Sequence, residues 1–296
     1  MMLKNIKQET GYKKLSMVSP ELNVEEIIRI MNDENLQVIN AINAARNSIS
    51  KAVNNSVDVI KSGKSLIYIG AGTSGRLGKL DASEVPPTFG VSADVVRAII
   101  AGGEKALTEA VEGAEDNEDD GINAVSEVRK NDMLIGITAS GTTPFTIAAL
   151  RQGKRLGARC WLLTCNDVEY DFLDGVIKLL VGPEIIAGST RLKAGTATKI
   201  VLNMISTATM IKLGKVYKGY MVDVVPSNKK LKARASKIIQ EITGCGIEEA
   251  EILLDKAGGN AKTAVLMYMK GLSCEEAKAL LKESGDSLKK AMENGS

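Results

Sequence analysis

The sequence predicts an α/β protein built on a doubly wound parallel sheet. Hydrophobic residues make up 44% of the 296 residues and aromatic residues only 3%, so the core is aliphatic, which suits helices packed on a parallel sheet. Short apolar runs alternate with helical patterns through the middle of the chain, as in repeated strand–helix units. From Gly246 onward there is no strand signal, which indicates an added helical module.

Residues 1–60 are expected to form an N-terminal helical segment. A helical pattern covers residues 21–61, with Asn23 in the position of an N-cap and Glu25 in the first turn. From Val38 to Ile60 the apolar residues recur with a helical period. Amphipathic helices that precede a sheet either cover one of its faces or pack against a second subunit.

Residues 61–225 are expected to form the sheet domain. Strands are predicted where short apolar runs end in turn residues, at 65–69, 95–100, 133–137, 160–164 and 175–181. Helices are predicted between and after them: one from Ser74 that closes at Pro86–Pro87, one over most of 104–130, one at 144–156 and one at 193–217.

The tail is expected to fold separately. Residues 226–244 are interpreted as a linker, whose Lys-rich part at 228–237 continues as a helix. Residues 245–296 repeat at a spacing of 27, since Glu248-Glu249-Ala250 returns as Glu275-Glu276-Ala277. Two copies of a helix–glycine–helix unit predict a small helical module.

Composition excludes several kinds of chemistry. The chain has no histidine, which rules out Ser-His-Asp and Cys-His systems and His-ligated metals. Proton transfer must then use Glu, Asp, Lys, Tyr or Cys. The four cysteines form no CxxC pair, so neither a zinc cluster nor a disulfide framework is indicated.

Charge and hydropathy bear on partners and location. The net charge of +2 and the few aromatic residues argue against nucleic acid as a partner. The chain opens without a secretory leader pattern, and no apolar stretch reaches membrane-spanning length. We therefore expect a cytoplasmic protein without a membrane partner.

The first candidate site is the turn Gly70-x-Gly72-x-x-Gly75, between a strand and a helix. Glycines let an anion approach the backbone, and the helix N-terminus offers unpaired N–H groups. The pattern lacks the Gly-Lys-Ser/Thr of a P-loop and, with Asp94 the only acid near the required offset, fits a dinucleotide site poorly. Gly72, Thr73 and Ser74 are the candidate phosphate ligands.

Two further hydroxyl-rich turns strengthen this interpretation. Ser140, Thr142 and Thr143 also follow a strand, and ligands of parallel sheets bind where strands end. A third turn carries Ser189, Arg191 and Lys193 before a helix. We expect a phosphate held between the first two turns, with the two cations serving the phosphate, a second anionic group or surface ion pairs. The alternative is ordinary helix capping at all three turns.

These turns are typical of the sugar isomerase (SIS) domain. The strings at 71–90 (AGTSGRLGKLDASEVPPTFG), 110–116 (AVEGAED) and 188–196 (GSTRLKAGT) are similar to those of the N-acetylmuramic acid 6-phosphate etherases. The tail resembles that family's UBA-like module, and glucokinase regulatory proteins are the nearest similar group. Thr142 departs from the family pattern, where arginine is frequent.

The resemblance implies a carbon–oxygen lyase of cell-wall recycling that needs no cofactor and no metal. It would convert N-acetylmuramic acid 6-phosphate to N-acetylglucosamine 6-phosphate and D-lactate. By motif, Glu84 is the proton-donating acid and Glu115 the second catalytic residue. The family also implies a flavodoxin-like sheet order and a homodimer.

Two glutamates suffice for this reaction without histidine. Ring opening places an aldehyde at C1, which acidifies the C2 proton, so one carboxylate removes it while a carboxylic acid protonates the departing lactyl oxygen. Which glutamate removes the C2 proton is left open by the sequence. Two other functions remain as alternatives: a non-catalytic sugar-phosphate-binding regulator, and an aldose–ketose sugar-phosphate isomerase. The acidic run at 116–120 mimics a calcium loop but is interpreted as a solvated helix face.

Overall fold

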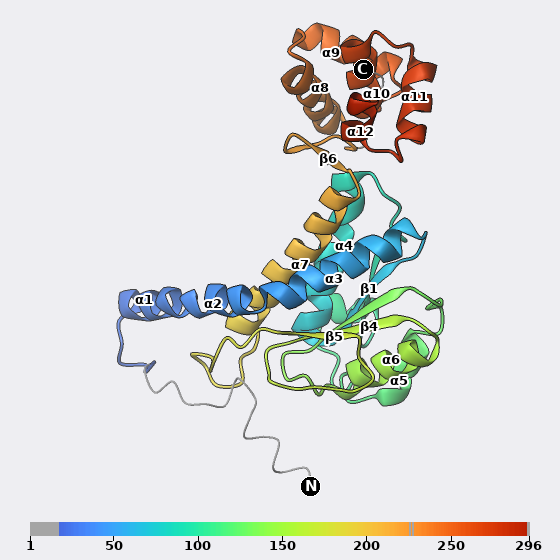
Figure 1. The fold of residues 1–296 in the computed structure, drawn as a ribbon. Coiled ribbons are helices and arrows are strands. Elements are labelled where there is room, and N and C mark those ends of the chain that lie inside the picture. The colour runs from blue at the N-terminus through green and yellow to red at the C-terminus, as the bar shows by residue number, and fades with distance from the viewer. Residues whose placement is uncertain (1–17, 225, 227, 295–296) are drawn as a thin grey trace. The chain divides into compact units, whose positions relative to one another are not determined.

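The computed structural model describes residues 18–294 except residues 225 and 227, and the chain forms two compact units (Figure 1). The first contains the described residues up to Ala82 together with Asp94–Ser206, and the second contains Ser83–Ala93 and the chain from Thr207 onward. Residues 1–17 of the expected N-terminal segment lie outside the described residues. The expected domain boundaries stay a prediction, because these units are drawn from contacts and interleave along the chain.

The first unit is built on a five-stranded parallel sheet of order β2-β1-β3-β4-β5. Its strands are β1 (Leu66–Gly70), β2 (Val96–Ile100), β3 (Met133–Ile137), β4 (Arg159–Thr164) and β5 (Gly175–Lys178). Every residue of β1 and β3 is buried, which explains why these strands read as continuous apolar runs. This confirms the doubly wound sheet with the flavodoxin-like order, in which ligands bind at the carboxyl ends of β1 and β3, where the strand order reverses.

Helices cover both faces of this sheet (Figure 1). On one face lie α5 (Glu118–Ala124) and α6 (Pro144–Arg155), where Phe145 and Leu150 pack with Ile67, Leu134 and Leu162. On the other face α3 (Arg46–Lys61) contacts β1, β3 and β5, preceded by α1 (Val24–Glu34) and α2 (Leu36–Ala44). The expected N-cap is confirmed: Asn23 and Glu26 form a capping box at the start of α1.

A buried carboxylate joins three elements on this second face. Tyr68 of β1 donates its hydroxyl to Asp81 Oδ2 (3.1 Å), and Asn203 and Ser206 donate to Oδ1 (2.6 and 3.0 Å). Asp81 lies in α4 (Gly72–Phe89), and its two other partners lie in α7 (Lys193–Lys212). Burial raises the pKa of Asp81, although these hydrogen bonds act in the opposite direction. The network therefore fastens the first part of α4 to β1 and α7.

Two predicted helices are wrong in extent. The helix after the first turn does not close at Pro86–Pro87, because α4 runs through both prolines to Phe89. Val85 and Phe89 are buried, and their packing outweighs the local cost of proline.

The region 104–130 is largely not helical. It contains only the 3₁₀ turn η3 (Glu104–Leu107) and the seven-residue α5. Gly113 has a φ of 72°, which an L-residue rarely adopts and which no helix contains. Two shorter corrections follow: β5 ends at Lys178 rather than 181, and α7 ends at Lys212 rather than 217.

The second unit contains the predicted helical tail. After the hairpin β6 (Val216–Tyr217) and β7 (Tyr220–Met221) come α8 (Lys229–Thr243), α9 (Ile247–Lys256), α10 (Ala261–Lys270), α11 (Cys274–Glu283) and α12 (Leu288–Glu293). The repeat predicted from the sequence corresponds to α9–α10 and α11–α12. Asn260 and Ser287 occupy equivalent places and cap the second helix of each pair. The likeness of this module to UBA domains stays a prediction.

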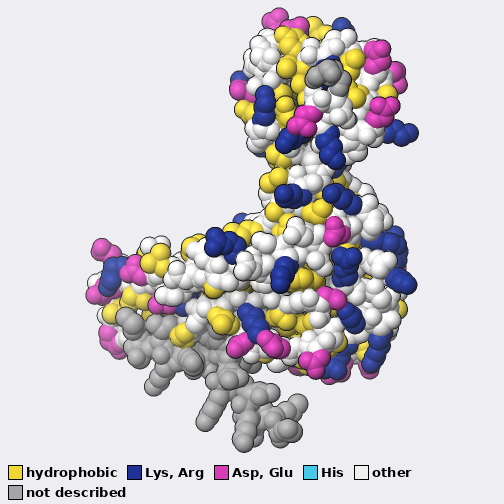
Figure 2. Space-filling view, in the orientation of Figure 1, with side chains coloured by type: hydrophobic (Ala, Val, Ile, Leu, Met, Phe, Trp, Pro, Cys, Tyr) yellow, Lys and Arg dark blue, Asp and Glu magenta, His cyan; other side chains and the backbone are white. Residues whose placement is uncertain are grey.

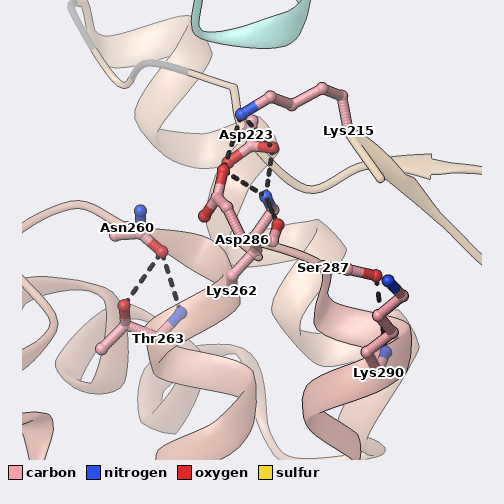
Figure 3. Close-up of polar contacts among 8 residues, drawn as sticks. All are labelled: Lys215, Asp223, Asn260, Lys262, Thr263, Asp286, Ser287 and Lys290. Atoms are coloured by element: carbon pink, nitrogen blue, oxygen red, sulfur yellow. Dashed lines mark hydrogen bonds and ion pairs between the residues drawn. The ribbon is translucent and has the colours of Figure 1, made fainter. Parts of the chain in front are cut away.

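A cluster of four charges around the buried Lys262 joins the hairpin region to the helices within this unit (Figure 3). Lys262 is fully buried, with its Nζ 2.5 Å from Asp223 Oδ2, 3.1 Å from Asp286 Oδ2 and 2.6 Å from the Asp286 carbonyl oxygen. Lys215 Nζ lies 2.7 Å from Asp286 Oδ2 and 3.5 Å from Asp223 Oδ2. Each lysine thus contacts both carboxylates.

The surface of the molecule shows no dominant charge on the face drawn in Figure 2, where Lys and Arg mix with Asp and Glu. Yellow hydrophobic side chains appear on the helical module, in which Ile247, Ile252, Tyr268 and Met269 are exposed. Within the described part of the chain, no helix has both the length and the apolar character needed to cross a bilayer.

Candidate active site

A pocket of about 370 Å³ opens at the carboxyl ends of β1 and β3, in the first unit. All three predicted turns contribute to its lining. The first turn supplies residues 71–74, the second supplies residues 138–140 and 142–144, and the third supplies Gly188 and Thr190. Glu115 and Asp116 are the two acidic residues of the lining.

The first turn places the beginning of α4 at the pocket. Because α4 begins at Gly72, the N–H groups of its first residues have no acceptor within the helix, and Gly72, Thr73 and Ser74 all line the pocket. A side chain at Gly75 would place its Cβ 2.6 Å from the Gly70 carbonyl oxygen and 2.6 Å from Ile100. Glycine there lets the helix start close against the sheet and direct its amides into the pocket.

The second turn is a network of hydroxyl groups. Thr138 Oγ1 lies 2.7 Å from Thr143 Oγ1 and 3.1 Å from Ser140 Oγ, and Ser140 Oγ also accepts from the amide of Thr142 (3.2 Å). Thr138 was not among the predicted site residues, although it stands at the start of the same hydroxyl-rich run. The hydroxyls are thus already oriented toward one another at the edge of the pocket.

Two side chains from the loop after β4 hold the second turn in place. Asn166 donates its amide to the Ser140 carbonyl (3.0 Å), and Tyr170 donates its hydroxyl to the Gly141 carbonyl (2.9 Å). Burial raises the pKa of Tyr170, so this hydroxyl stays protonated and able to donate at neutral pH.

Glu115 reaches the pocket through its backbone. The amide of Phe145, in the first turn of α6, donates to the Glu115 carbonyl (3.0 Å). Since α6 follows the second turn directly, this bond brings a loop residue from before α5 beside the hydroxyl network. The sequence predicted Glu115 for the site, and the structure places it in the same pocket as the candidate phosphate ligands.

The third turn differs from the other two. Glu184, buried, accepts from the amides of Lys193 (3.0 Å) and Ala194 (2.9 Å) and so occupies the start of α7. Lys193 is itself buried, with its Nζ 2.5 Å from Glu34 of α1. Arg191 is exposed, and neither it nor Ser189 is among the residues that line the pocket.

Glu84 lies outside this pocket lining as well. It is exposed on α4, in the short segment that groups with the second unit. The structure therefore brings together seven of the predicted site residues: Gly72, Thr73, Ser74, Glu115, Ser140, Thr142 and Thr143. Among the described residues, no cluster of three or more His, Cys, Asp or Glu has the arrangement of a metal site.

Comparison with known proteins finds one family model and several relatives that cover most of the chain. The family model for the glucokinase regulatory protein N-terminal SIS domain matches residues 48–154. The N-acetylmuramic acid 6-phosphate etherase of Geobacillus thermodenitrificans is 45% identical, with 92% of this chain and 94% of that protein covered.

Two further relatives have similar names. N-acetylmuramic acid 6-phosphate etherase 1 of Bacillus licheniformis is 51% identical, covering 82% of this chain and 81% of that protein. N-acetylmuramic acid 6-phosphate etherase 2 of Vibrio cholerae is 48% identical, covering 92% of this chain and 90% of that protein. At this identity and coverage, the chain belongs to the N-acetylmuramic acid 6-phosphate etherase family.

Proposed function

We propose that this protein is a carbon–oxygen lyase that removes the D-lactyl ether from N-acetylmuramic acid 6-phosphate. The products are N-acetylglucosamine 6-phosphate and D-lactate, which places the reaction in amino-sugar metabolism and cell-wall recycling. Etherase relatives that are 45–51% identical support this assignment. The observation that carries it is the pocket in which Glu115 lies beside two turns suited to a phosphate.

The phosphate is bound by the first two turns. Backbone amides at the start of α4 and the positive end of its dipole favour an anion, and Gly72, Thr73 and Ser74 supply them. Ser140, Thr142 and Thr143 of the second turn, which also line the pocket, add hydroxyl donors. Together they hold the sugar phosphate with its reacting carbons toward Glu115.

The reaction proceeds by elimination and hydration. In the open-chain sugar, a carboxylate takes the C2 proton, the C3–O bond breaks, and a carboxylic acid gives its proton to the lactyl oxygen, so D-lactate leaves. Water then adds at C3 of the unsaturated sugar while a proton returns to C2. Glu115 and Glu84 provide the two carboxyl groups, Glu84 on the strength of its family motif.

The test is D-lactate release from N-acetylmuramic acid 6-phosphate, compared with the unphosphorylated sugar. We expect release only from the phosphorylated form, and a loss of about 10²- to 10⁴-fold in kcat for Glu115→Gln and for Glu84→Gln, because each removes a proton-transfer group. Full activity in either variant contradicts the role of that glutamate.

The same assay separates the alternatives. A regulator binds the sugar phosphate and releases no lactate, whereas an isomerase exchanges the C2 proton with solvent and leaves the ether intact. Binding is measured by calorimetry and exchange by NMR in deuterated water.

The protein is further proposed to act as a homodimer in the cytoplasm. None of the eleven residues of α1 is buried, and Val24 and Ile28 are 71% and 60% exposed. An amphipathic helix with its apolar side chains in water is a typical subunit contact. The cytoplasmic location stays a prediction from the sequence.

A further inference from the structure

The substrate of the proposed function carries two anionic groups, the 6-phosphate and the lactyl carboxylate. The pocket lining contains two acidic residues, Glu115 and Asp116, and, among the described residues, neither lysine nor arginine. A second anion close to these carboxylates is bound well only if a cation balances it. Among the described basic residues, three lie within three positions in sequence of a lining residue: Arg76, Arg191 and Lys193.

Arg76 follows the first turn in α4, and one edge of its guanidinium is already bound to backbone carbonyl groups. Its Nε donates to the carbonyl oxygens of Ala106 (2.9 Å) and Leu107 (3.2 Å), and Nη2 donates to that of Glu109 (2.8 Å). These bonds fix the loop that leads from β2 toward Glu115. Arg76 therefore supports the wall of the pocket, with its Nε and Nη2 held by this loop.

Lys193 already has a partner for its charge. Its side chain is 3% exposed and its Nζ is paired with Glu34. The amides at the start of α7 are likewise taken, because both carboxylate oxygens of Glu184 accept from them. The third turn thus lacks the free helix amides that the first turn offers to a phosphate.

Arg191 is the cation that stays available. It directly follows Thr190, which lines the pocket, its residue is exposed, and it forms no ion pair with any residue that the structure describes. A guanidinium presents two parallel N–H donors to the two oxygens of a carboxylate. The phosphate already has its donors on the first and second turns, so the anion left for the third turn is the carboxylate.

We propose that Arg191 binds the lactyl carboxylate and thereby selects the lactyl ether over the same sugar phosphate without it. This inference rests on the proposed function for the identity of the substrate. It divides the pocket into a phosphate side at the first and second turns and a carboxylate side at the third.

The product N-acetylglucosamine 6-phosphate provides the test, because it keeps the sugar and the phosphate and lacks the lactyl group. For Arg191→Gln we expect kcat/KM for N-acetylmuramic acid 6-phosphate to fall about 10- to 100-fold, as for the loss of a hydrogen-bonded charged partner. The inhibition constant of the product should change less than about twofold, since the interaction removed serves only the lactyl group. Arg191→Lys should recover part of the loss.

Two controls sharpen the comparison. Arg155→Gln removes an equal charge from an exposed position on α6 and should leave both values unchanged. Ser140→Ala should weaken substrate and product together, because both carry the phosphate. If Arg191→Gln weakens the binding of substrate and product equally, or weakens the binding of neither, the inference is wrong.

The outcome is separable from that of the proposed function. If the unaltered protein releases no lactate, calorimetry with both sugar phosphates still compares their affinities in the unaltered protein and in Arg191→Gln. A selective loss for the lactyl sugar supports the carboxylate site, and an equal or absent loss overturns it.

Discussion

Thr138 shows how single residues set the pocket. Its side chain is buried at the base of the second turn, 2.7 Å from the Thr143 hydroxyl and 3.1 Å from that of Ser140. Because it bonds both, it orients two groups that we assign to the phosphate.

Replacing Thr138 with valine keeps the shape and removes the hydroxyl. A net hydrogen bond is worth about 1 kcal/mol, so we expect KM for the sugar phosphate to rise about 5-fold with kcat nearly unchanged. Thr138→Ser keeps the hydroxyl and should stay close to the unaltered value. Steady-state lactate release measures both, and a fall in kcat without a change in KM would show that Thr138 acts on the chemistry instead.

The candidate site was predictable from the sequence as far as its chemistry is local. Ser74, Ser140 and Thr143 follow strands, and the parallel sheet brings such turns to one edge. The ion pair of Lys193 was not predictable, because its partner Glu34 lies 159 residues away in the sequence. Glu184 belongs to no sequence motif. That it accepts hydrogen bonds from the amides at the start of α7 is visible only in the structure.

At the scale of elements, the charged cluster of the second unit shows how one repeat departs from the other. Asp286 stands where the first repeat has Gly259, and both have positive φ, 59° and 84°. An acid at such a position is strained, yet Asp286 pairs with both Lys215 and Lys262. Lys289, the counterpart of Lys262, is 74% exposed. The module has gained a buried ionic contact in one copy only.

Lys262→Met should therefore be strongly destabilising, by about 3–5 kcal/mol, since it removes the nearer partner of the largely buried Asp223 carboxylate and leaves it Lys215 at 3.5 Å. Lys289→Met, the matched change in the other repeat, should cost less than about 0.5 kcal/mol. Urea unfolding followed by circular dichroism gives both values. Equal effects of the two variants would contradict the importance of the cluster.

The loss of stability in Lys262→Met should depend on pH, and the direction of that dependence follows from the two carboxyl groups. Burial raises the pKa of Asp223 even beside Lys262, and without the lysine the ionised form becomes less favourable still. Burial also opposes ionisation of Asp286, but the hydrogen bond from Lys215 and the charge of Lys262 outweigh it and lower its pKa. Loss of Lys262 weakens that effect. Protonating either group relieves the unpaired charge, so the deficit of Lys262→Met should narrow as pH falls from 7 toward 5.

Element types were largely predictable, and element ends were not. The buried strands and the repeated tail follow from apolar runs and from a spacing of 27 residues. The helix predicted over most of 104–130 was wrong, because the composition of this region suits a helix but Arg76 binds three of its carbonyl groups in another conformation. The helix end predicted at Pro86 and Pro87 was also wrong, since the burial of Val85 and Phe89 maintains the helix through both prolines.

At the scale of the whole molecule, the two units interleave along the chain, because residues 83–93 group with the tail while both flanking segments belong to the sheet unit. Such a division depends on contacts between distant residues, so composition alone cannot locate it. The sequence indicated amphipathic helices before the sheet, which either cover a face of it or pack against a second subunit. In α1 and α2 the residues Val24, Ile28, Leu36 and Ile39 are all more than half exposed, at 71%, 60%, 65% and 52%.

This surface predicts the assembly state. Burying a large aliphatic side chain is worth about 1.5–3 kcal/mol, so several of them on one pair of helices are enough to favour a subunit contact. We expect light scattering after size exclusion to show a dimer, and the double substitution Val24→Glu with Ile28→Glu to shift it toward monomer. Ile252→Glu is the matched control, because Ile252 is 54% exposed but lies in the helical module, and it should leave the dimer intact. A fully active monomer in the unaltered protein would show that the apolar face of α1 and α2 serves something other than a second copy of the chain.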